Sequence, residues 1–369
     1  EDFNKFVQNE ELEQNIKDAL YEKLFWTPQE QPLHKDLLKD LAGKWLVRNS
    51  YILQWPALHI IVVTLYCNHA CKYCHASART KDPEKYHMSI EQAKKVVDVI
   101  FETTAWSITI EFQWWEPLAN WDVVKYVIWY AKEKNKEYDL DMDITIVSNL
   151  TLMDDEKLEY LVDNDVSIST SLDWQKELHD YNRVYINWSS FDTLAHWIPI
   201  INQKYIEKWS WKRVWAVATA TKKSLDYHKE IVDTFIDMWL DWIFIRPLNP
   251  FGMALKLWDE IGYSYEEYSV FYKKLLDYVD QKKSEWIRFK ESFRDIYLYN
   301  MHSPRKVNYM EERSPCWAWL WQLAYNWDGK VYTCDEWRMI GTMGDDAFKV
   351  WEIDLNKDSK EIYHDIISS

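Results

Sequence analysis

The feature that most constrains the fold of this chain is an alternation of short apolar runs with longer amphipathic stretches. Six runs rich in β-branched residues have the length of buried strands: Leu58–Leu65, Ser107–Phe112, Asp143–Ser148, Val166–Leu172, Val214–Thr221 and Ile243–Arg246. Patterns with the period of an α-helix lie between them: Ser89–Glu102, Asp122–Lys136, Asp154–Asn164 and Tyr227–Met238. Apolar strands separated by helices predict a parallel sheet covered by helices.

Six strand–helix units favour an α/β fold with a partial (β/α)6 barrel over a short doubly wound sheet. Right-handed crossovers place every loop that follows a strand at one end of the sheet, where the active sites of α/β proteins form. We expect this core at residues 55–250, after an N-terminal helical extension at 1–54. A helical bridge is expected at 251–312 and a smaller domain at 313–369.

Three of the five cysteines directly follow the first predicted strand, in Cys67-Asn-His-Ala-Cys71-Lys-Tyr-Cys74. An odd number of cysteines with three in one loop fits metal binding better than disulfides, and it predicts a reducing compartment, the cytoplasm. Thiolates at this C-x3-C-x2-C spacing can hold a compact iron–sulfur cluster and leave its fourth iron without a protein ligand. The alternative is a structural zinc site that takes His69 or His75 as its fourth ligand.

The glycine and tryptophan contents are abnormal in opposite directions. The 369 residues include 6 Gly and 24 Trp, whereas average usage gives roughly 26 Gly and about five Trp. The codon UGA is read as Trp under some genetic codes and as Gly under others. Our hypothesis is that most of these tryptophans are glycines misread in translation.

The remaining composition is that of a globular protein, with 47% hydrophobic and 28% charged residues. A net charge of −16 argues against a nucleic acid or an anionic membrane as the main partner. The apolar run His59–Cys67 is far shorter than a membrane span, and no signal peptide is visible. Because the chain begins at Glu1 rather than Met, we expect a fragment or a processed form.

The cysteine loop, with the aromatic Tyr73 before its third cysteine, resembles the cluster-binding motif of the radical S-adenosylmethionine (SAM) superfamily. The resemblance implies that Cys67, Cys71 and Cys74 hold a [4Fe-4S] cluster whose fourth iron chelates the amino and carboxylate groups of SAM. In that family an electron from the cluster cleaves SAM to a 5′-deoxyadenosyl radical, which abstracts a hydrogen from the substrate. The cofactors supply this chemistry, while the protein orients the reactants and excludes water. Tyr73 would lie beside the nucleoside or pack in the core.

A second motif, Gln113-Trp114-Trp115-Glu116-Pro117, ends the next predicted strand. The family has Gly-Gly-Glu-Pro there, where the backbone contacts the SAM amino group. The resemblance therefore implies that Trp114, Trp115, Glu116 and Pro117 seat this group, although two indoles occupy the space that glycines leave for a ligand. The family pattern has Gly where this chain has Trp at positions 55, 114, 115, 174, 317, 319, 321 and 337.

Polar residues at the ends of later strands extend the resemblance. The dipeptide Ser148-Asn149 follows the third strand, where the family contacts the SAM ribose. The next strand ends in Ser171-Leu172-Asp173, which is familiar in peptide-modifying members. Arg183 is a candidate partner of the SAM carboxylate, because a guanidinium pairs well with carboxylates. Arg246 ends the sixth strand and either faces the pocket or caps the barrel.

The C-terminal region predicts a β-hairpin formed by Leu323–Asn326 and Lys330–Cys334. Cys316 and Cys334 flank this hairpin, which resembles the start of the SPASM-type auxiliary-cluster domain of peptide-modifying radical SAM enzymes. The resemblance implies an auxiliary iron–sulfur cluster. Its ligand set is incomplete, because no cysteine follows Cys334, and we expect that the chain is cut off. Two unrelated buried thiols are the alternative.

Residues 54–69, read with Gly at position 55, resemble the radical SAM maturases of His-Xaa-Ser peptide systems. This resemblance implies an enzyme that abstracts hydrogen from a side chain of a ribosomally made precursor peptide, with a crosslink as the outcome and flavodoxin or ferredoxin as reductant. A radical SAM enzyme acting on a protein, as in sulfatase maturation, and a non-catalytic zinc-stabilised binding module are the alternatives. No motif identifies a catalytic acid or base.

Overall fold

The computed structural model describes residues 56–76, 83–103, 105–302, 318, 321–342 and 344–368. The chain divides into two units after Gln54, and all described residues belong to the second unit. The predictions for residues 1–54, Trp55, Cys316 and the tryptophans at 317 and 319 concern positions outside the described residues. In the part of the chain that the structure describes, no helix is long and apolar enough to cross a membrane.

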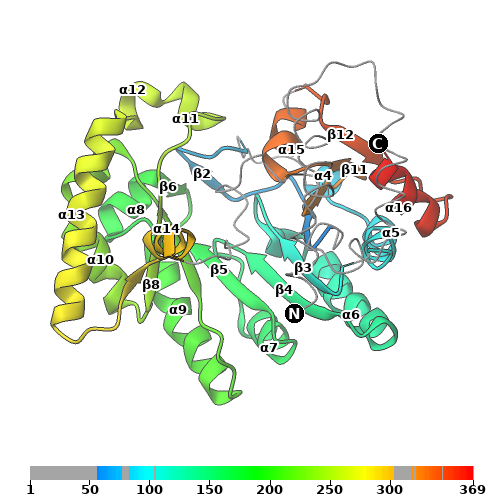
Figure 1. Cartoon of the computed structure of the whole chain (residues 1–369), viewed down its shortest axis with the longest axis horizontal. Coiled ribbons are helices and arrows are strands. Elements are labelled where there is room, and N and C mark those ends of the chain that lie inside the picture. Colours follow the sequence, from blue (N-terminus) through cyan, green and yellow to red (C-terminus); the bar gives the residue numbers. More distant parts are fainter. Residues whose placement is uncertain are drawn as a thin grey trace, which may run out of the picture. The chain divides into compact units, whose positions relative to one another are not determined.

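One ten-stranded sheet organises the described unit (Figure 1), with the strand order β12-β11-β10-β1-β3-β4-β5-β7-β8-β9. The six predicted strands are confirmed as parallel neighbours in this sheet: β1 (Leu58–Ile61), β3 (Ser107–Phe112), β4 (Asp141–Val147), β5 (Ser167–Ser171), β7 (Trp215–Thr219) and β8 (Trp242–Arg246). The predicted α/β class with a mostly parallel sheet is therefore confirmed. A separate antiparallel pair, β2 (His69–Cys71) and β6 (Arg183–Tyr185), places Cys71 opposite Arg183.

Helices follow the strands and pack on the outer face of the sheet (Figure 1). The four predicted helices are confirmed: α5 (Ile90–Ile100), α6 (Trp121–Tyr138), α7 (Asp155–Asp163) and α10 (His228–Asp237). Ser89 and Asp154 accept backbone N–H groups at the starts of α5 and α7, which is why these helices begin where the sequence predicted. The remaining elements of the core are α4 (Pro83–Tyr86), η2 (Pro117–Asn120), α8 (Lys176–Asn182), α9 (Ser190–Glu207) and η3 (Lys222–Asp226).

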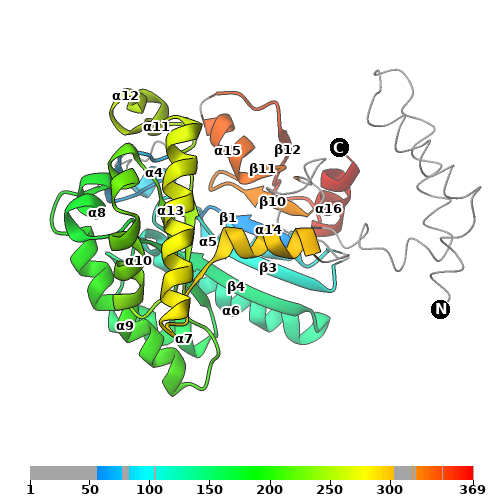
Figure 2. The same cartoon turned by 60° about the vertical axis from the view of Figure 1, so that its left-hand side comes forward.

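The segment after β8 is mostly helical, as predicted, and contains α11 (Met253–Lys256), α12 (Trp258–Ile261), α13 (Tyr265–Ser284), β9 (Lys290–Glu291) and α14 (Ser292–His302). The predicted hairpin is confirmed as β10 (Gln322–Tyr325) and β11 (Lys330–Tyr332). It is followed by α15 (Asp335–Thr342), β12 (Lys349–Glu352) and α16 (Ser359–Ser368). The sequence did not predict that β10 pairs in parallel with β1, so that the C-terminal segment extends the main sheet (Figure 2).

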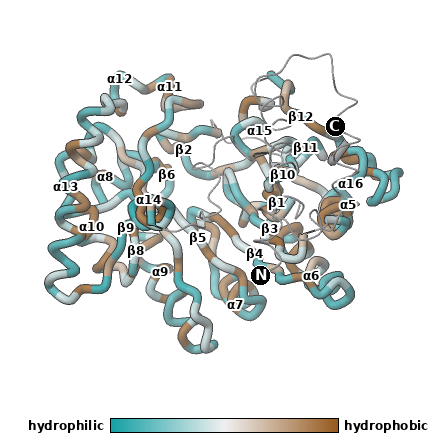
Figure 3. Tube along the Cα trace, in the orientation of Figure 1, coloured by the Kyte–Doolittle hydropathy of each residue, from teal (hydrophilic) through white to brown (hydrophobic). Residues whose placement is uncertain are grey.

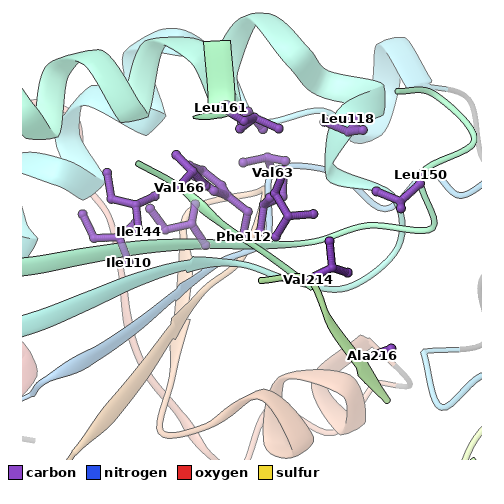
Figure 4. Packing of buried hydrophobic residues seen from close by; sticks show 14 of the residues in the cluster. Val63, Ile110, Phe112, Leu118, Ile144, Leu150, Leu161, Val166, Val214 and Ala216 are labelled. Atoms are coloured by element: carbon purple, nitrogen blue, oxygen red, sulfur yellow. The ribbon is translucent and has the colours of Figure 1, made fainter. Parts of the chain in front are cut away.

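The main core lies between the sheet and its outer helices. In β3, alternate residues Ile108, Ile110 and Phe112 are buried on this face. Figure 4 shows Ile110 and Phe112 among the side chains that pack beneath Leu161 of α7. In Figure 3, hydrophobic residues (brown) occur along β4 and α7, which both contribute to this core. Because side chains alternate along a strand, Glu111 points to the opposite, inner face, on which the candidate site is built.

Nine described non-glycine residues have a positive φ, and six of them are tryptophans: Trp114, Trp115, Trp174, Trp209, Trp239 and Trp286. Glycine adopts this region freely, whereas a residue with a Cβ is strained by about 1–2 kcal/mol in the left-handed conformation. The first three of these positions are among those where the family pattern predicted Gly. The other two described positions of that prediction, Trp321 and Trp337, do not have a positive φ, so the backbone there accommodates a side chain.

Trp209, Trp239 and Trp286 end three helices, α9, α10 and α13, in the same way. At α9, the N–H of Trp209 donates to Ile206 O at 3.0 Å and the N–H of Ser210 donates to Tyr205 O at 2.9 Å. The same pair of hydrogen bonds ends α10 and α13. This is the Schellman motif, in which the residue just after the helix is usually Gly. Three further tryptophans thus stand in glycine positions that the sequence alone did not identify.

Candidate cofactor site

A cavity of about 220 Å³ lies at the carboxyl ends of the parallel strands. Ten of the residues that the sequence assigned to the site line it together: Cys67, Cys71, Tyr73, Cys74, Trp114, Trp115, Ser148, Asn149, Ser171 and Arg183. These residues are far apart in the sequence. All but Arg183 belong to the cysteine loop or lie at the end of a strand of the parallel sheet. Arg183 reaches the cavity because β6 pairs with β2, which places it opposite Cys71. The expected convergence of the strand-end loops is therefore present.

The cysteine loop is folded back on itself beside the end of β1. Cys74 N–H donates to Cys71 O at 3.1 Å, and His69 N–H donates to Cys67 Sγ at 3.4 Å. Burial raises the pKa of the Cys67 thiol well above its usual value and raises the pKa of Cys71 to about 12. Thiols in such surroundings keep their protons unless a metal centre binds the sulfur atoms and displaces those protons.

The spacing of the sulfur atoms distinguishes the two kinds of metal site. A tetrahedral zinc ion with Zn–S bonds of about 2.3 Å holds its sulfurs about 3.8 Å apart. Among the described residues, the three loop cysteines, with or without His69 or His75, do not form a group whose ligand atoms all lie within 4.8 Å of one another. A cluster of several irons separates its thiolates more widely than a single ion does. The loop therefore fits an iron–sulfur cluster better than zinc.

A buried ionic network lies against the cysteine loop. Tyr73 Oη donates to both oxygens of the Asp173 carboxylate, at 2.8 and 2.6 Å, and Arg183 Nε lies 3.6 Å from Asp173 Oδ2. Asp173 is fully buried and does not line the cavity, whereas Arg183 does. Burial raises the pKa of Asp173, and the charge of Arg183 opposes this shift. Asp173 thus holds Tyr73 and Arg183 in place at the cavity wall.

Glu116 is also buried behind the cavity and does not line it. Its carboxylate accepts hydrogen bonds from Ser148 Oγ at 2.8 Å, from Asn149 N–H at 2.8 Å and from Leu118 N–H at 3.0 Å. Burial raises the pKa of Glu116 to about 7 against the effect of these donors. Pro117 lies at the start of η2, outside the cavity lining. Through these hydrogen bonds, Glu116 connects the end of β3 to the end of β4.

The C-terminal segment packs directly on the Trp114-Trp115 motif. Asp335, at the start of α15, accepts a hydrogen bond from Trp114 Nε1 at 3.0 Å, and Cys334 just before it is buried. The ligand atoms of Cys334, Asp335 and Glu336 all lie within 4.8 Å of one another. Since Cys316 is outside the described residues, the structure describes only one of the two cysteines expected at an auxiliary cluster.

Several residues line the cavity without having been assigned to it from the sequence: Gln113, Thr219, Pro247 and Asn249 among them. His69 and His75, the candidate ligands of the alternative zinc site, line it as well. Arg246 also lines the cavity, which favours the pocket-facing interpretation of this residue over the capping one. Each of these residues is in the cysteine loop or follows a parallel strand. Their place in the topology identifies them, because residues such as Thr219 and Asn249 belong to no motif.

Comparison with known proteins identifies the same region. Residues 61–232 match the sequence profile of the radical SAM superfamily. Radical SAM cyclopropyl synthase TigE of Paramaledivibacter caminithermalis is 28% identical over 134 residues, which are 33% of this chain and 28% of TigE. An uncharacterized protein of Methanothermobacter thermautotrophicus is 26% identical over 249 residues, which are 67% of this chain and 79% of that protein.

Solved structures share the fold at low sequence identity. The structure of anSMEcpe with bound AdoMet and Cp18Cys peptide has a TM-score of 0.65 and 19% identity, over 84% of this chain and 80% of that one. SuiB of Streptococcus suis bound to precursor peptide SuiA has a TM-score of 0.60 and 15% identity, over 99% of this chain and 78% of SuiB. The parallel sheet, the three-cysteine loop after its first strand and the matched profile identify residues 61–232 as a radical SAM superfamily domain.

Proposed function

We propose that this protein is a radical SAM enzyme that modifies side chains of a ribosomally made precursor peptide. The observation that carries the proposal is the convergence of three cysteines and a ring of polar strand-end residues on one cavity. Two structural neighbours, SuiB and anSMEcpe, were crystallised with peptides, which supports a peptide as the substrate class. A reductant such as flavodoxin or ferredoxin would supply the electron.

The chain's own residues have distinct roles in this proposal. Cys67, Cys71 and Cys74 hold the cluster. When bound, the cluster and SAM supply a 5′-deoxyadenosyl radical that abstracts hydrogen from the peptide. Arg183 binds the SAM carboxylate through its guanidinium, while Asp173 fixes the orientation of that side chain. The buried walls exclude water from the reacting groups.

Further contacts follow from the cavity lining. Ser148 and Asn149 would contact the SAM ribose, and both line the cavity together with Ser171. Tyr73 lines the cavity, where its ring would lie beside the nucleoside, and its hydroxyl is bonded to Asp173. Glu116 and Pro117 support the amino-group site from behind rather than touching SAM. Cys316 and Cys334 would belong to an auxiliary cluster.

The proposed activity belongs to a chain with Gly at positions 114 and 115. The φ angles there are 74° and 54°, and both indoles project from the backbone into the cavity lining. The indole nitrogens of Trp115 and Trp174 are buried and have no hydrogen-bond partner within the described part of the chain, which adds a cost that glycine avoids. Peptides of the native protein that span these positions should therefore have the mass of the glycine form, and the codons should be UGA. The codon UGG at 114 and 115 would contradict this.

The activity is tested with the Trp114→Gly/Trp115→Gly protein after anaerobic iron–sulfur reconstitution. We expect a brown protein that forms 5′-deoxyadenosine from SAM with dithionite as reductant, and the Cys71→Ala variant in the same background should lose both properties. The chain with Trp at both positions should assemble the cluster but cleave SAM far more slowly. One tightly bound zinc and no SAM cleavage by the glycine form would instead support a zinc-stabilised module. A short peptide-coding frame beside the gene would favour a peptide substrate over a protein substrate.

A further inference from the structure

Arg338 of α15 is a buried cation to which none of the roles above applies. Its side chain is fully buried, and Nε, Nη1 and Nη2 have no hydrogen-bond partner among the described residues. Burial lowers the pKa of Arg338 to about 10, which still leaves the guanidinium charged at neutral pH. Buried charges are ordinarily paired, because their removal from water is costly. This guanidinium is therefore missing an anion.

In the chain with both tryptophans, the neighbouring acidic groups make no hydrogen bond with this guanidinium. Both Asp335 oxygens are engaged by other donors, Oδ1 by Gln322 Nε2 at 2.9 Å and Oδ2 by Trp114 Nε1 at 3.0 Å. Glu336 is on the same helix but makes no hydrogen bond with the guanidinium. The nearby Tyr332 hydroxyl donates to Asp346 at 2.7 Å.

Arg338 lies against the two indoles of the cavity wall. The carbon of its guanidinium lies 4.9 Å from the ring centre of Trp115 and 5.8 Å from that of Trp114. Both tryptophans line the cavity. With glycine at these positions, the rings that cover the guanidinium are absent and the space they occupy joins the cavity. Arg338 then borders the cavity, and Asp335 Oδ2, which loses its donor Trp114 Nε1, competes with an entering carboxylate for the guanidinium.

We propose that in the glycine form Arg338 binds a carboxylate that enters this cavity. A guanidinium binds a carboxylate through two parallel hydrogen bonds, a geometry that an ammonium group cannot reproduce. The carboxylate comes either from SAM or from an acidic side chain of the peptide substrate. The inference rests on the proposed function. Its tests measure carboxylate binding rather than SAM cleavage, so the inference and the proposed function can fail separately.

The first test measures binding in the reconstituted Trp114→Gly/Trp115→Gly protein, which carries Arg338. The added variants are Arg338→Gln, Arg338→Lys and, as a matched control for loss of one positive charge, Arg288→Gln at an exposed position. The probes are SAM, decarboxylated SAM and, for the SAM-loaded protein, propionate as a mimic of an acidic side chain. Calorimetry gives the affinities for the first two, and saturation-transfer NMR follows propionate.

We expect Arg338→Gln to weaken binding of one carboxylate about 10- to 100-fold, which is the range for loss of a charge-assisted hydrogen bond. If the partner is SAM, SAM affinity falls while that of decarboxylated SAM stays constant. If the partner is the peptide, SAM affinity stays constant and the propionate signal is lost. Arg338→Lys should recover part of the loss, and Arg288→Gln should change nothing. Unchanged binding of both SAM and propionate to Arg338→Gln would overturn the proposal.

A second test needs no substitution of Arg338 and so does not depend on the folding of its variants. Phenylglyoxal should modify Arg338 in the ligand-free glycine form, as read by peptide mass mapping, and the bound carboxylate should protect it. In the chain with both tryptophans, the indoles should keep Arg338 unreactive. An Arg338 that stays unreactive in the glycine form would show that it does not border the cavity.

Discussion

Glu116 Oε1 accepts a hydrogen bond from Ser148 Oγ at 2.8 Å, and this contact joins the end of β3 to the end of β4. The other oxygen, Oε2, accepts the backbone N–H of Asn149 at 2.8 Å. The sequence assigned all three residues to the SAM site by resemblance. In the structure, Ser148 and Asn149 line the cavity, and Glu116 fixes their positions from behind. One carboxylate thus sets the relative position of two strand ends on which the site depends.

Glu116→Ala should lower the free energy of unfolding by about 3 kcal/mol, because buried N–H groups of Asn149 and Leu118 lose their acceptor. Urea denaturation of the glycine form measures the change. Glu156→Ala removes a carboxylate whose side chain is 82% exposed and serves as the control, with an expected change near zero. Equal effects of the two substitutions would show that the contacts of Glu116 contribute nothing to stability.

Trp→Gly substitutions at the three Schellman positions should stabilise the protein. Trp209, Trp239 and Trp286 are 95%, 66% and 96% exposed, so replacing them sacrifices little packing. Each substitution relieves the strain of a side chain at positive φ, and we expect a gain of about 1 kcal/mol per site. Thermal and urea unfolding of the single variants measure the gain.

Trp129→Gly is the matched control for this series. Trp129 is 52% exposed and lies inside α6, where its φ is not positive. Glycine in a helix interior lowers stability, by about 0.5 kcal/mol relative to Trp. We therefore expect Trp→Gly to raise the free energy of unfolding at the three helix ends and to lower it at position 129. A uniform loss at all four positions would argue that the tryptophans at the helix ends are the native residues.

The elements that the sequence predicted are those with a strong local signal. Two of the four helices, α5 and α7, begin at the capping residues Ser89 and Asp154. Apolar residues alternate with polar ones along β3, which is the pattern of a strand with one face in the core. The helix α9 was missed, because Pro199 within it weakens the helical pattern. The pairing of β10 with β1 was also missed, since a contact between Ile60 and Ala324 leaves no trace in the local pattern of either segment.

The candidate site was predictable as far as a motif extends. The cysteine loop and Arg183 were placed by resemblance, and the cavity brings them together. The supporting role of Glu116 was not predictable. A family motif shows that a residue is present, but it does not show whether its side chain faces the cavity or lies behind it. Arg338 had no motif at all, and only its burial without an acceptor singles it out.

Glu111 should make stability depend on pH. Burial, aided by the charge of Asp335, raises the pKa of Glu111 from 4.5 to about 7. Below pH 4.5 the carboxyl is protonated in both the folded and the unfolded chain, and its contribution is fully present. As the pH rises from 4.5 to 7, the unfolded chain ionises first, so the free energy of unfolding falls, by about 3 kcal/mol in total. Above pH 7 the loss is complete.

Glu111→Gln should remove this part of the pH dependence. The variant should match the parent protein near pH 4 and exceed its stability near pH 8, because an amide does not ionise and can still accept the Thr145 hydroxyl. Urea denaturation across this pH range measures the difference. Glu156→Gln, at an exposed position, should leave the profile unchanged. A difference between Glu111→Gln and parent that stays constant with pH would contradict the assignment.

Tyr73→Phe should weaken SAM binding without removing any group that we expect to touch the SAM carboxylate. Tyr73 Oη donates to both oxygens of buried Asp173, and its loss leaves Arg183 as the main counter-charge of that carboxylate. We expect the guanidinium to turn from the cavity toward Asp173, and SAM affinity of the glycine form to fall about tenfold. Calorimetry measures the affinity, and Tyr181→Phe, which removes an exposed hydroxyl bonded to Glu260, is the control. If Tyr73→Phe binds SAM as the parent does, the orientation of Arg183 does not depend on this network, and its proposed role at the carboxylate loses its structural basis.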